Sequence, residues 1–346
     1  MHIFLADLPN PLGGANQERG ETALLFRRYG VDVTCLHFPS CHCGGETQQL
    51  TDDNPWIKRM EEAGIGLVGG ESGKMSEVPG LPGSIILGMC CQHVLHNWPE
   101  LHGLGCRLVW SPAMNFTRPV ETEAFRVCPP TAVHFQSQYQ FDEISGEYSD
   151  WGCKEFVRAY GAFEPLRHLS LDREPEGPFV IGRLARKCRT KWTPHLWRML
   201  SAVRERVPIR ALCQGWDEHL TAHCGEPPDW AECLAPNTIS AQDFLSRCHA
   251  LICPNWSVQE NWPRVGLEAM SVGVPLVVDD AGGWEEMLGP AGIRCQTLGD
   301  YVPALVRLAT DEDYRQHVIA GQLARVRYLG NPDQIWRAWR MLFERI

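Results

Sequence analysis

Short apolar runs alternate with longer helix-like stretches along the chain, and this alternation is the feature that most constrains its fold. Helical patterns such as Asn16–Tyr29 and Pro55–Ala63 lie between the runs. Several runs are continuously apolar, which is typical of parallel strands that are covered on both faces. The pattern therefore predicts an α/β fold with a doubly wound parallel sheet. In the first half, the strand candidates are His2–Asp7, Val31–His37, Gly66–Gly69, Ser84–Gly88, Cys106–Trp110 and Thr131–Phe135.

The same alternation starts again after Asp172–Pro178, a charged segment rich in proline and glycine that we interpret as a linker. A chain of 346 residues is about twice the usual length of one domain. We therefore expect two Rossmann-like domains that face each other across a cleft, over residues 1–172 and 173–330, and a last helix over 331–346 that crosses back to the first domain. In the second half, the strand candidates are Phe179–Gly182, Ile209–Cys213, Ala250–Pro254, Pro275–Asp279 and Ile293–Cys295.

The overall composition excludes several classes of protein. The 32 basic and 42 acidic side chains give a net charge of −10, so we expect no nucleic-acid partner. The first residues, MHIFLADLP, predict a strand instead of a signal peptide, and no apolar run is long enough to span a bilayer. Fifteen scattered cysteines suit a reducing compartment. These features predict a cytoplasmic protein.

One group of side chains has the chemistry of metal ligands. It consists of His37, Cys41, His42 and Cys43, and it has no second cysteine pair at the spacing of a zinc finger. We therefore predict a loop with ordinary side chains and no metal.

Two carboxylates in the second half, Glu260 and Glu268, stand eight positions apart. Glu268 lies within a predicted helix over Arg264–Val272, and Glu260 lies in the loop before it. A buried strand then leads to a glycine pair that opens another helix. Ligands of open α/β sheets bind beyond the carboxyl ends of the strands, and glycine turns at helix N-termini offer free N–H groups to anions. The segment is therefore a candidate anion-binding site.

This ordered set of elements resembles the donor-binding half of retaining GT-B glycosyltransferases, the group related to sucrose synthase and to bacterial mannosyl- and glucosyltransferases. The elements are the Glu-x7-Glu spacing, the stretch EAMSVGVPLVV, and the turn Gly282-Gly283-Trp-Glu-Glu286. The resemblance implies the GT-B fold and a donor site that binds a nucleotide-diphosphate sugar.

Two upstream segments are similar to the same family. The strand end Gly182-Arg183-Leu184 followed by Lys191 resembles the pattern in which an arginine and a lysine hold the donor diphosphate, although Lys187 stays open as an alternative to Lys191. Near the N-terminus, Gly13 and Gly14 occupy the place of the family's first glycine-rich loop.

The resemblance implies a role for each of these residues. Arg183 and Lys191 would stabilise the leaving diphosphate, Glu260 would hold the hydroxyls of the donor sugar, and Glu268 would hold the ribose. These residue types suit the chemistry, because arginine and lysine bind phosphate and carboxylates accept bonds from hydroxyls. The further donor-binding candidates are Arg264, Gly13, Gly14, Gly282, Gly283 and Glu286.

The first domain is expected to bind the acceptor. Many relatives have a histidine after a strand in the middle of this domain, but the corresponding segment Trp110–Asn115 has none. Asn115 and His93 are the candidates on this side.

The expected activity is retaining transfer of a sugar from a UDP- or GDP-sugar to the hydroxyl of a glycan, a lipid-linked acceptor or a small molecule. We expect no cofactor and no metal. A sugar-nucleotide epimerase, a phosphorylase and a non-catalytic sugar-nucleotide-binding protein stay open as alternatives. The last helix carries Trp336 and Trp339. We expect it to pack on the first domain, and a peripheral contact with the inner face of the membrane is the alternative.

Overall fold

The structure is a computed structural model of the chain, and it describes residues 1–9, 14–38, 54–165, 177–255 and 257–346. It divides into two compact units. The first contains Met1–Glu164 and Gly330–Ile346, and the second contains Pro165–Leu329. The glycine Gly13, the residues Cys41–Cys43 and most of the predicted linker lie outside the described residues.

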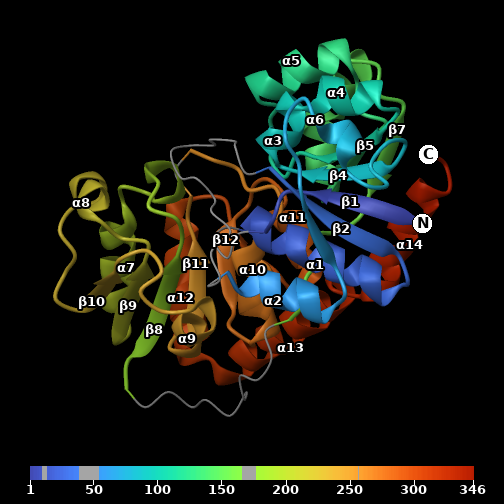
Figure 1. Ribbon diagram of the computed structural model, residues 1–346. Coiled ribbons are helices and arrows are strands. Elements are labelled where there is room, and N and C mark those ends of the chain that lie inside the picture. Colours follow the sequence, from blue (N-terminus) through green and yellow to red (C-terminus); the bar gives the residue numbers. More distant parts are fainter. Residues whose placement is uncertain (10–13, 39–53, 166–176, 256) are drawn as a thin grey trace. The chain divides into compact units, whose positions relative to one another are not determined.

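The first unit is built on a seven-stranded parallel sheet with the strand order β3-β2-β1-β4-β5-β6-β7 (Figure 1). Helices cover both faces of this sheet. The strands are β1 (His2–Ala6), β2 (Asp32–His37), β3 (Gly66–Gly69), β4 (Ile85–Met89), β5 (Arg107–Ser111), β6 (Ala132–Phe135) and β7 (Glu155–Arg158). The helices are α1 (Gly14–Arg28), α2 (Pro55–Glu62), α3 (Gln92–His96), α4 (Trp98–Gly103), α5 (Pro119–Val127), α6 (Gln138–Asp150) and α14 (Pro332–Phe343), with a short 3-10 turn at Met75–Glu77.

The two faces of the first sheet bury separate clusters of apolar side chains. Along β1, Ile3 and Leu5 belong to the cluster that also contains Trp339, while Phe4 belongs to the cluster that contains Trp98. Successive side chains of a strand point to opposite faces, so β1 must be apolar at every buried position, from Ile3 to Ala6. This burial on both faces explains why the first strand is a continuous apolar run.

The second unit has a six-stranded parallel sheet with the order β10-β9-β8-β11-β12-β13. Its strands are β8 (Phe179–Leu184), β9 (Ile209–Gln214), β10 (Ala231–Leu234), β11 (Ala250–Cys253), β12 (Leu276–Asp279) and β13 (Ile293–Cys295). Its helices are α7 (Leu196–Arg204), α8 (Glu218–Cys224), α9 (Ala241–Ser246), α10 (Arg264–Ser271), α11 (Trp284–Leu288), α12 (Leu298–Thr310) and α13 (Glu312–Leu329), with 3-10 turns η2 (Arg189–Lys191) and η3 (Gly289–Ala291). Each unit is therefore a doubly wound, Rossmann-like domain, and the predicted fold class is confirmed.

The structure contains two strands that the sequence analysis did not predict, β7 and β10. Each lies at an edge of its sheet. Their sequences, EFVR and AECL, are short and carry charged side chains. An edge strand exposes one side to water, and charges there prevent association with other edges, so such strands lack the continuous apolar run of a central strand.

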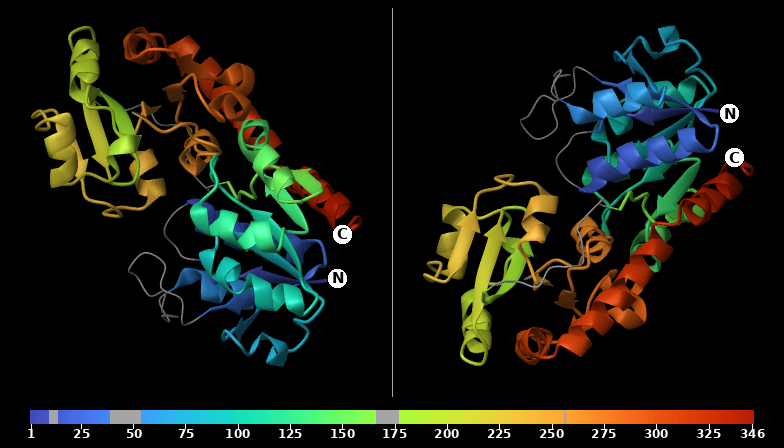
Figure 2. Two further views of the ribbon diagram at one scale, coloured as in Figure 1. Left: turned by 90° about the horizontal axis from the view of Figure 1, so that it is seen from above. Right: turned by 90° about the horizontal axis from the view of Figure 1, so that it is seen from below.

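The last helix, α14, belongs to the first unit. In both views of Figure 2 the two ends of the chain lie close together. Trp339 of α14 packs edge-to-face on Phe26 of α1 with ring centroids 5.3 Å apart, and it packs on His134 of β6 at 4.4 Å. The apolar face of the helix is thus buried in the core of this unit. Within the described part of the chain, no helix combines the length and the apolar character needed to cross a membrane.

Candidate active site

Arg183 lies in β8 with only 3% of its surface exposed. Its guanidinium group donates hydrogen bonds to the carbonyl of Lys191, to Oδ1 of Asn255 at 2.9 Å and to the carbonyl of Ile252 at 3.4 Å. It also lies over the ring of Trp192, at 5.4 Å from the centroid. Arg183 therefore fixes the chain segments that follow β8 and β11 relative to each other.

Lys191 and Glu260 form an ion pair through Nζ and Oε1. Their side chains are 16% and 18% exposed, so both are mostly shielded from water but remain accessible to a ligand. Asn255 donates a further hydrogen bond to the same carboxylate oxygen at 3.3 Å. Lys187, the alternative to Lys191, is exposed. The structure thus brings Arg183, Lys191 and Glu260 together through Asn255.

Asp279, a half-buried acid at the end of β12, supports this network. The backbone N–H of Asn255 donates to Oδ2 of Asp279 at 2.7 Å, and the hydroxyl of Tyr301 donates to Oδ1 at 2.8 Å. Burial raises the pKa of Asp279 above its ordinary value, although the hydrogen bonds from Tyr301 and Asn255 and the charge of Arg183 act in the opposite direction. Asp279 thereby holds the backbone that carries the Asn255 side chain.

The glycine pair before α11 packs directly on the loop that carries Glu260. The backbone N–H of Gly283 donates to the carbonyl of Glu260 at 2.7 Å. A Cβ atom at Gly282 would lie 2.4 Å from the same carbonyl oxygen, and one at Gly283 would lie 1.7 Å from the carbonyl oxygen of Asn261. Gly282 also adopts a positive φ of 64°, which glycine tolerates without strain. Only glycine fits this contact, and the contact fixes the backbone of Glu260.

The second carboxylate of the pair, Glu268, lies one turn into α10. It forms an ion pair with Arg264 across 3.2 Å, and both side chains are largely buried, with 16% and 14% exposed. Arg264 is the first residue of the helix. Glu286 lies half-buried in the first turn of α11, and its backbone carbonyl accepts a hydrogen bond from Arg325. Each of these three predicted residues lies at or near the start of a helix that follows a strand of the second sheet.

The predicted residues of the first unit lie in helices α1 and α3 and in the loop after β5. Gly14 is the exposed first residue of α1. Asn115 follows β5 and donates a hydrogen bond to the hydroxyl of Tyr139 at 3.0 Å. His93 follows β4 and is buried against Asp7, with 2.9 Å between Nδ1 and Oδ2. His93 therefore participates in a buried polar cluster of the first unit.

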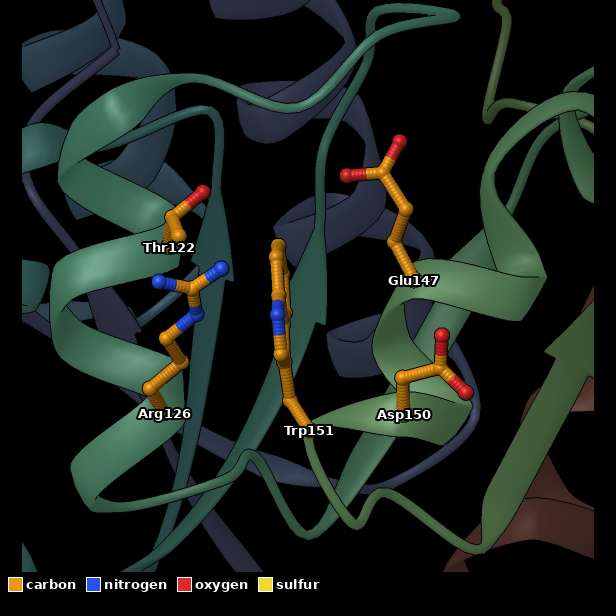
Figure 3. A pocket seen from close by; sticks show the side chains of 5 residues that line it. All are labelled: Thr122, Arg126, Glu147, Asp150 and Trp151. Carbon is orange, nitrogen blue, oxygen red and sulfur yellow. The ribbon is translucent and has the colours of Figure 1, made fainter.

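A polar pocket opens in the first unit between α5 and α6 (Figure 3). The ring of Trp151 stands between Arg126 of α5 on one side and Glu147 and Asp150 of α6 on the other. Thr122 completes the lining. None of the predicted site residues lines this pocket.

Two residues of the candidate active site were missed by the sequence analysis. Asn255 joins Arg183 to Glu260, and Asp279 holds Asn255. Both stand at or directly after the carboxyl end of a predicted strand, where ligands of such sheets bind. Their position after predicted strands could therefore have identified them as candidate site residues.

The arrangement suits a ligand that combines negative charge with hydroxyl groups. Arg183 and Lys191 supply positive charge, and the Glu260 carboxylate accepts hydrogen bonds. Carboxylates repel a phosphate, so the two kinds of side chain must contact different parts of the ligand. The N-terminus of α11 contacts the backbone of Glu260 through Gly283, so it lies next to the loop that carries this carboxylate.

Comparison with known proteins agrees with this description. Residues 178–311 match the family "Glycosyl transferases group 1". No curated protein matches the chain in sequence. Among solved structures, HepE of Anabaena in complex with UDP and glucose has a TM-score of 0.70 and 14% identity over 100% of both chains.

Two further solved structures are similar over 99% of both chains. A mutant of S. aureus TarM in complex with Fondaparinux, alpha-GlcNAc-glycerol and UDP has a TM-score of 0.75 and 9% identity. The pneumococcal O-GlcNAc transferase GtfA in complex with UDP and GlcNAc has a TM-score of 0.73 and 10% identity. These similarities show that the fold is GT-B.

Proposed function

We propose that this chain, a GT-B glycosyltransferase whose second unit belongs to the group 1 family, transfers a sugar with retention from a nucleoside-diphosphate sugar to an acceptor hydroxyl. UDP is the favoured nucleotide, because HepE, TarM and GtfA were each solved with UDP. The observation that carries the proposal is the network in which Arg183, Asn255, Lys191 and Glu260 meet at the carboxyl edge of the second sheet.

The ion pair between Lys191 and Glu260 explains how the donor is received. A diphosphate attracts the ammonium group of Lys191, and this releases the carboxylate of Glu260 to accept hydrogen bonds from the sugar hydroxyls. The Arg183 side chain is too deeply buried to move toward the ligand. Instead, it holds the Lys191 backbone and Asn255 in place and adds its fixed positive charge. Preorganised charges of this kind stabilise charge that develops in the transition state.

The bonds exchange on one face of the donor sugar. The bond between the anomeric carbon and the β-phosphate oxygen breaks, and the acceptor oxygen forms the new bond to the same carbon. The acceptor proton passes to the departing phosphate oxygen. Arg183 and Lys191 offset the negative charge of the nucleoside diphosphate, so the proposed reaction uses no metal, and added Mg²⁺ or Mn²⁺ is expected to leave the rate unchanged. In this proposal the enzyme works in the cytoplasm.

Product analysis tests the proposal. The full chain is incubated with UDP-glucose and a panel of glycans and glycerol-linked acceptors, and UDP release and the anomeric configuration of the product are measured by NMR. We expect an acceptor to accelerate UDP release and to give an α-linked product. A β-linked product would contradict retention. Isomerised donor without UDP release would establish an epimerase instead.

A further inference from the structure

A buried cluster in the first unit has the chemistry of a metal site. Asp7 follows β1, and Cys91 and His93 follow β4. These two strands are adjacent and parallel, so their carboxyl ends meet at one edge of the sheet. The three side chains are 4%, 3% and 5% exposed. A carboxylate, a thiol and an imidazole therefore converge in an interior where charged and polar groups normally need partners.

We propose that Asp7, Cys91 and His93 bind one Zn²⁺ ion. Nδ1 of His93 lies 2.9 Å from Oδ2 of Asp7, and Sγ of Cys91 lies 3.9 Å from the same oxygen. One ligand atom from each residue lies within 4.8 Å of the other two. Around a tetrahedral zinc, nitrogen and oxygen ligands stand about 3.3 Å apart and sulfur and oxygen ligands about 3.5 Å apart. The nitrogen–oxygen and sulfur–oxygen distances thus each differ from the zinc values by about 0.4 Å, and the three side chains must shift slightly to surround the ion.

The hydrogen bonding of His93 supports the proposal independently of these distances. Nδ1 of His93 contacts Oδ2 of Asp7, while Nε2 is buried and makes no hydrogen bond with any residue that the structure describes. Buried polar atoms without a partner are rare in folded proteins. A metal ion would give this imidazole a second partner beside Asp7.

The backbone around the cluster is strained. Asp7 has a φ of 70° and Cys90 has a φ of 50°, and both are residues other than glycine. Such conformations cost free energy and occur preferentially where a side chain must be placed for function. Here the strain lies at one ligand and at the residue directly before another.

A neighbouring histidine orients the carboxylate. Nδ1 of His37 lies 3.1 Å from Oδ1 of Asp7, the oxygen that does not face His93. Arg19 holds the two loops by donating to the carbonyls of Met89 at 2.6 Å and Leu8 at 3.4 Å. Metal ligands are commonly fixed by hydrogen bonds of this kind. His37 is thus a positioning residue for Asp7.

The mixture of ligands selects the metal. Thiolate and imidazole favour zinc, whereas magnesium and calcium prefer oxygen ligands alone. The thiolate and the carboxylate together balance the two positive charges of Zn²⁺, and the thiol proton is released to the solvent on binding. The site is made of residues of the first unit, and the donor chemistry proposed for the second unit uses no metal.

Cobalt substitution tests the proposal. The full chain is stripped with a chelator and titrated with Co²⁺ and then with Zn²⁺, and the thiolate-to-cobalt charge-transfer absorption is recorded. We expect one equivalent of Co²⁺ to bind and Zn²⁺ to displace it. Cys91→Ser should lose the absorption band, while Cys90→Ser, which removes the adjacent thiol, should retain it. His37→Gln should weaken binding roughly 10- to 100-fold.

A second measurement covers the case in which a variant folds poorly. Zn²⁺ should raise the unfolding temperature of the stripped wild type and of Cys90→Ser, but not that of Asp7→Asn or His93→Gln. Failure of the wild type to bind Co²⁺ stoichiometrically would overturn the proposal, as would an unchanged absorption band in Cys91→Ser. Sugar transfer is not the readout, so this result is independent of the proposed function.

Discussion

At the scale of single residues, the side chains of the candidate active site already form hydrogen bonds and an ion pair with their neighbours. The terminal nitrogens of Arg183 donate to carbonyl and amide acceptors, and Lys191 is paired with Glu260. A ligand must therefore exchange these contacts for its own. Positive charge that is held in place before the ligand arrives needs no reorganisation during the reaction, and this is the source of its catalytic value.

The two lysines after β8 provide a matched pair of variants. Lys191→Ala should lower kcat/KM for transfer by about 10- to 100-fold, because a hydrogen bond to a charged group contributes roughly 1.5–3 kcal/mol. Lys187→Ala removes the same charge from an exposed position four residues away and should leave kcat/KM within about twofold of the wild type. Steady-state kinetics on both variants check this, and an equal loss in both would contradict the assignment of Lys191.

Arg183→Ala should reduce kcat by on the order of 10²–10³-fold, the usual cost of losing one preorganised donor. The variant loses the hydrogen bonds that fix Lys191 and Asn255. Arg189→Ala, an exposed arginine of η2, is the control and should keep normal turnover.

The unfolding temperature of Arg183→Ala is measured alongside its kinetics, because the side chain is buried. Arg183→Lys keeps the charge but lacks the planar group that reaches three acceptors. Compared with Arg183→Ala, we expect it to recover more of the unfolding temperature than of the turnover rate. Near-normal turnover of a folded Arg183→Ala would refute the role of this residue.

At the scale of elements, the glycine turn before α11 determines where Glu260 lies. Gly283→Ala places a Cβ atom 1.7 Å from the carbonyl oxygen of Asn261, so the loop that carries Glu260 must move. We expect at least a tenfold loss of kcat/KM and a loss of about 1–3 kcal/mol in the free energy of unfolding.

Gly299→Ala is the control in the same unit. Its Cβ atom would lie in the first turn of α12, no closer than 3.4 Å to Thr297, and the free energy of unfolding should change by about 0.5 kcal/mol or less. Urea unfolding and kinetics distinguish the two variants. Normal activity of Gly283→Ala would show that the turn does not position Glu260.

Sequence reasoning predicted the elements that carry strong local signals. The central strands were found because burial on both faces makes them continuously apolar, and the edge strands β7 and β10 were missed because they are short and charged. Arg183 and Glu260 were proposed from the family motif. Their connection through Asn255 was not, because it depends on which loops the strand order β8-β11-β12 brings together. The cluster of Asp7 and His93 was missed for the same reason.

At the scale of the whole molecule, the chain leaves the first unit at Glu164 and returns to it at Gly330. Trp339 of α14 completes the core of that unit by packing on Phe26 and His134. Trp339→Ala should lower the free energy of unfolding by about 3–5 kcal/mol, the usual cost of removing a large buried aromatic ring. Met341→Ala, on the same helix but 49% exposed, should change it by about 0.5 kcal/mol or less.

Urea unfolding followed by circular dichroism checks this pair of variants. Equal stabilities of Trp339→Ala and Met341→Ala would mean that α14 contributes little to the first unit. Unequal stabilities in the expected order would establish that the first unit folds around both ends of the chain.

The central claim is that the second unit binds a nucleoside diphosphate through Lys191 beside Glu260. Thermal unfolding with UDP, GDP and ADP tests it most directly, with wild type, Lys191→Ala and Lys187→Ala compared side by side. A nucleotide at 100 times its Kd should add about 2.7 kcal/mol of stability. We predict that UDP raises the unfolding temperature of the wild type and of Lys187→Ala and raises that of Lys191→Ala much less. No shift of the wild type with any of the three nucleotides, or equal shifts in both lysine variants, would contradict the account.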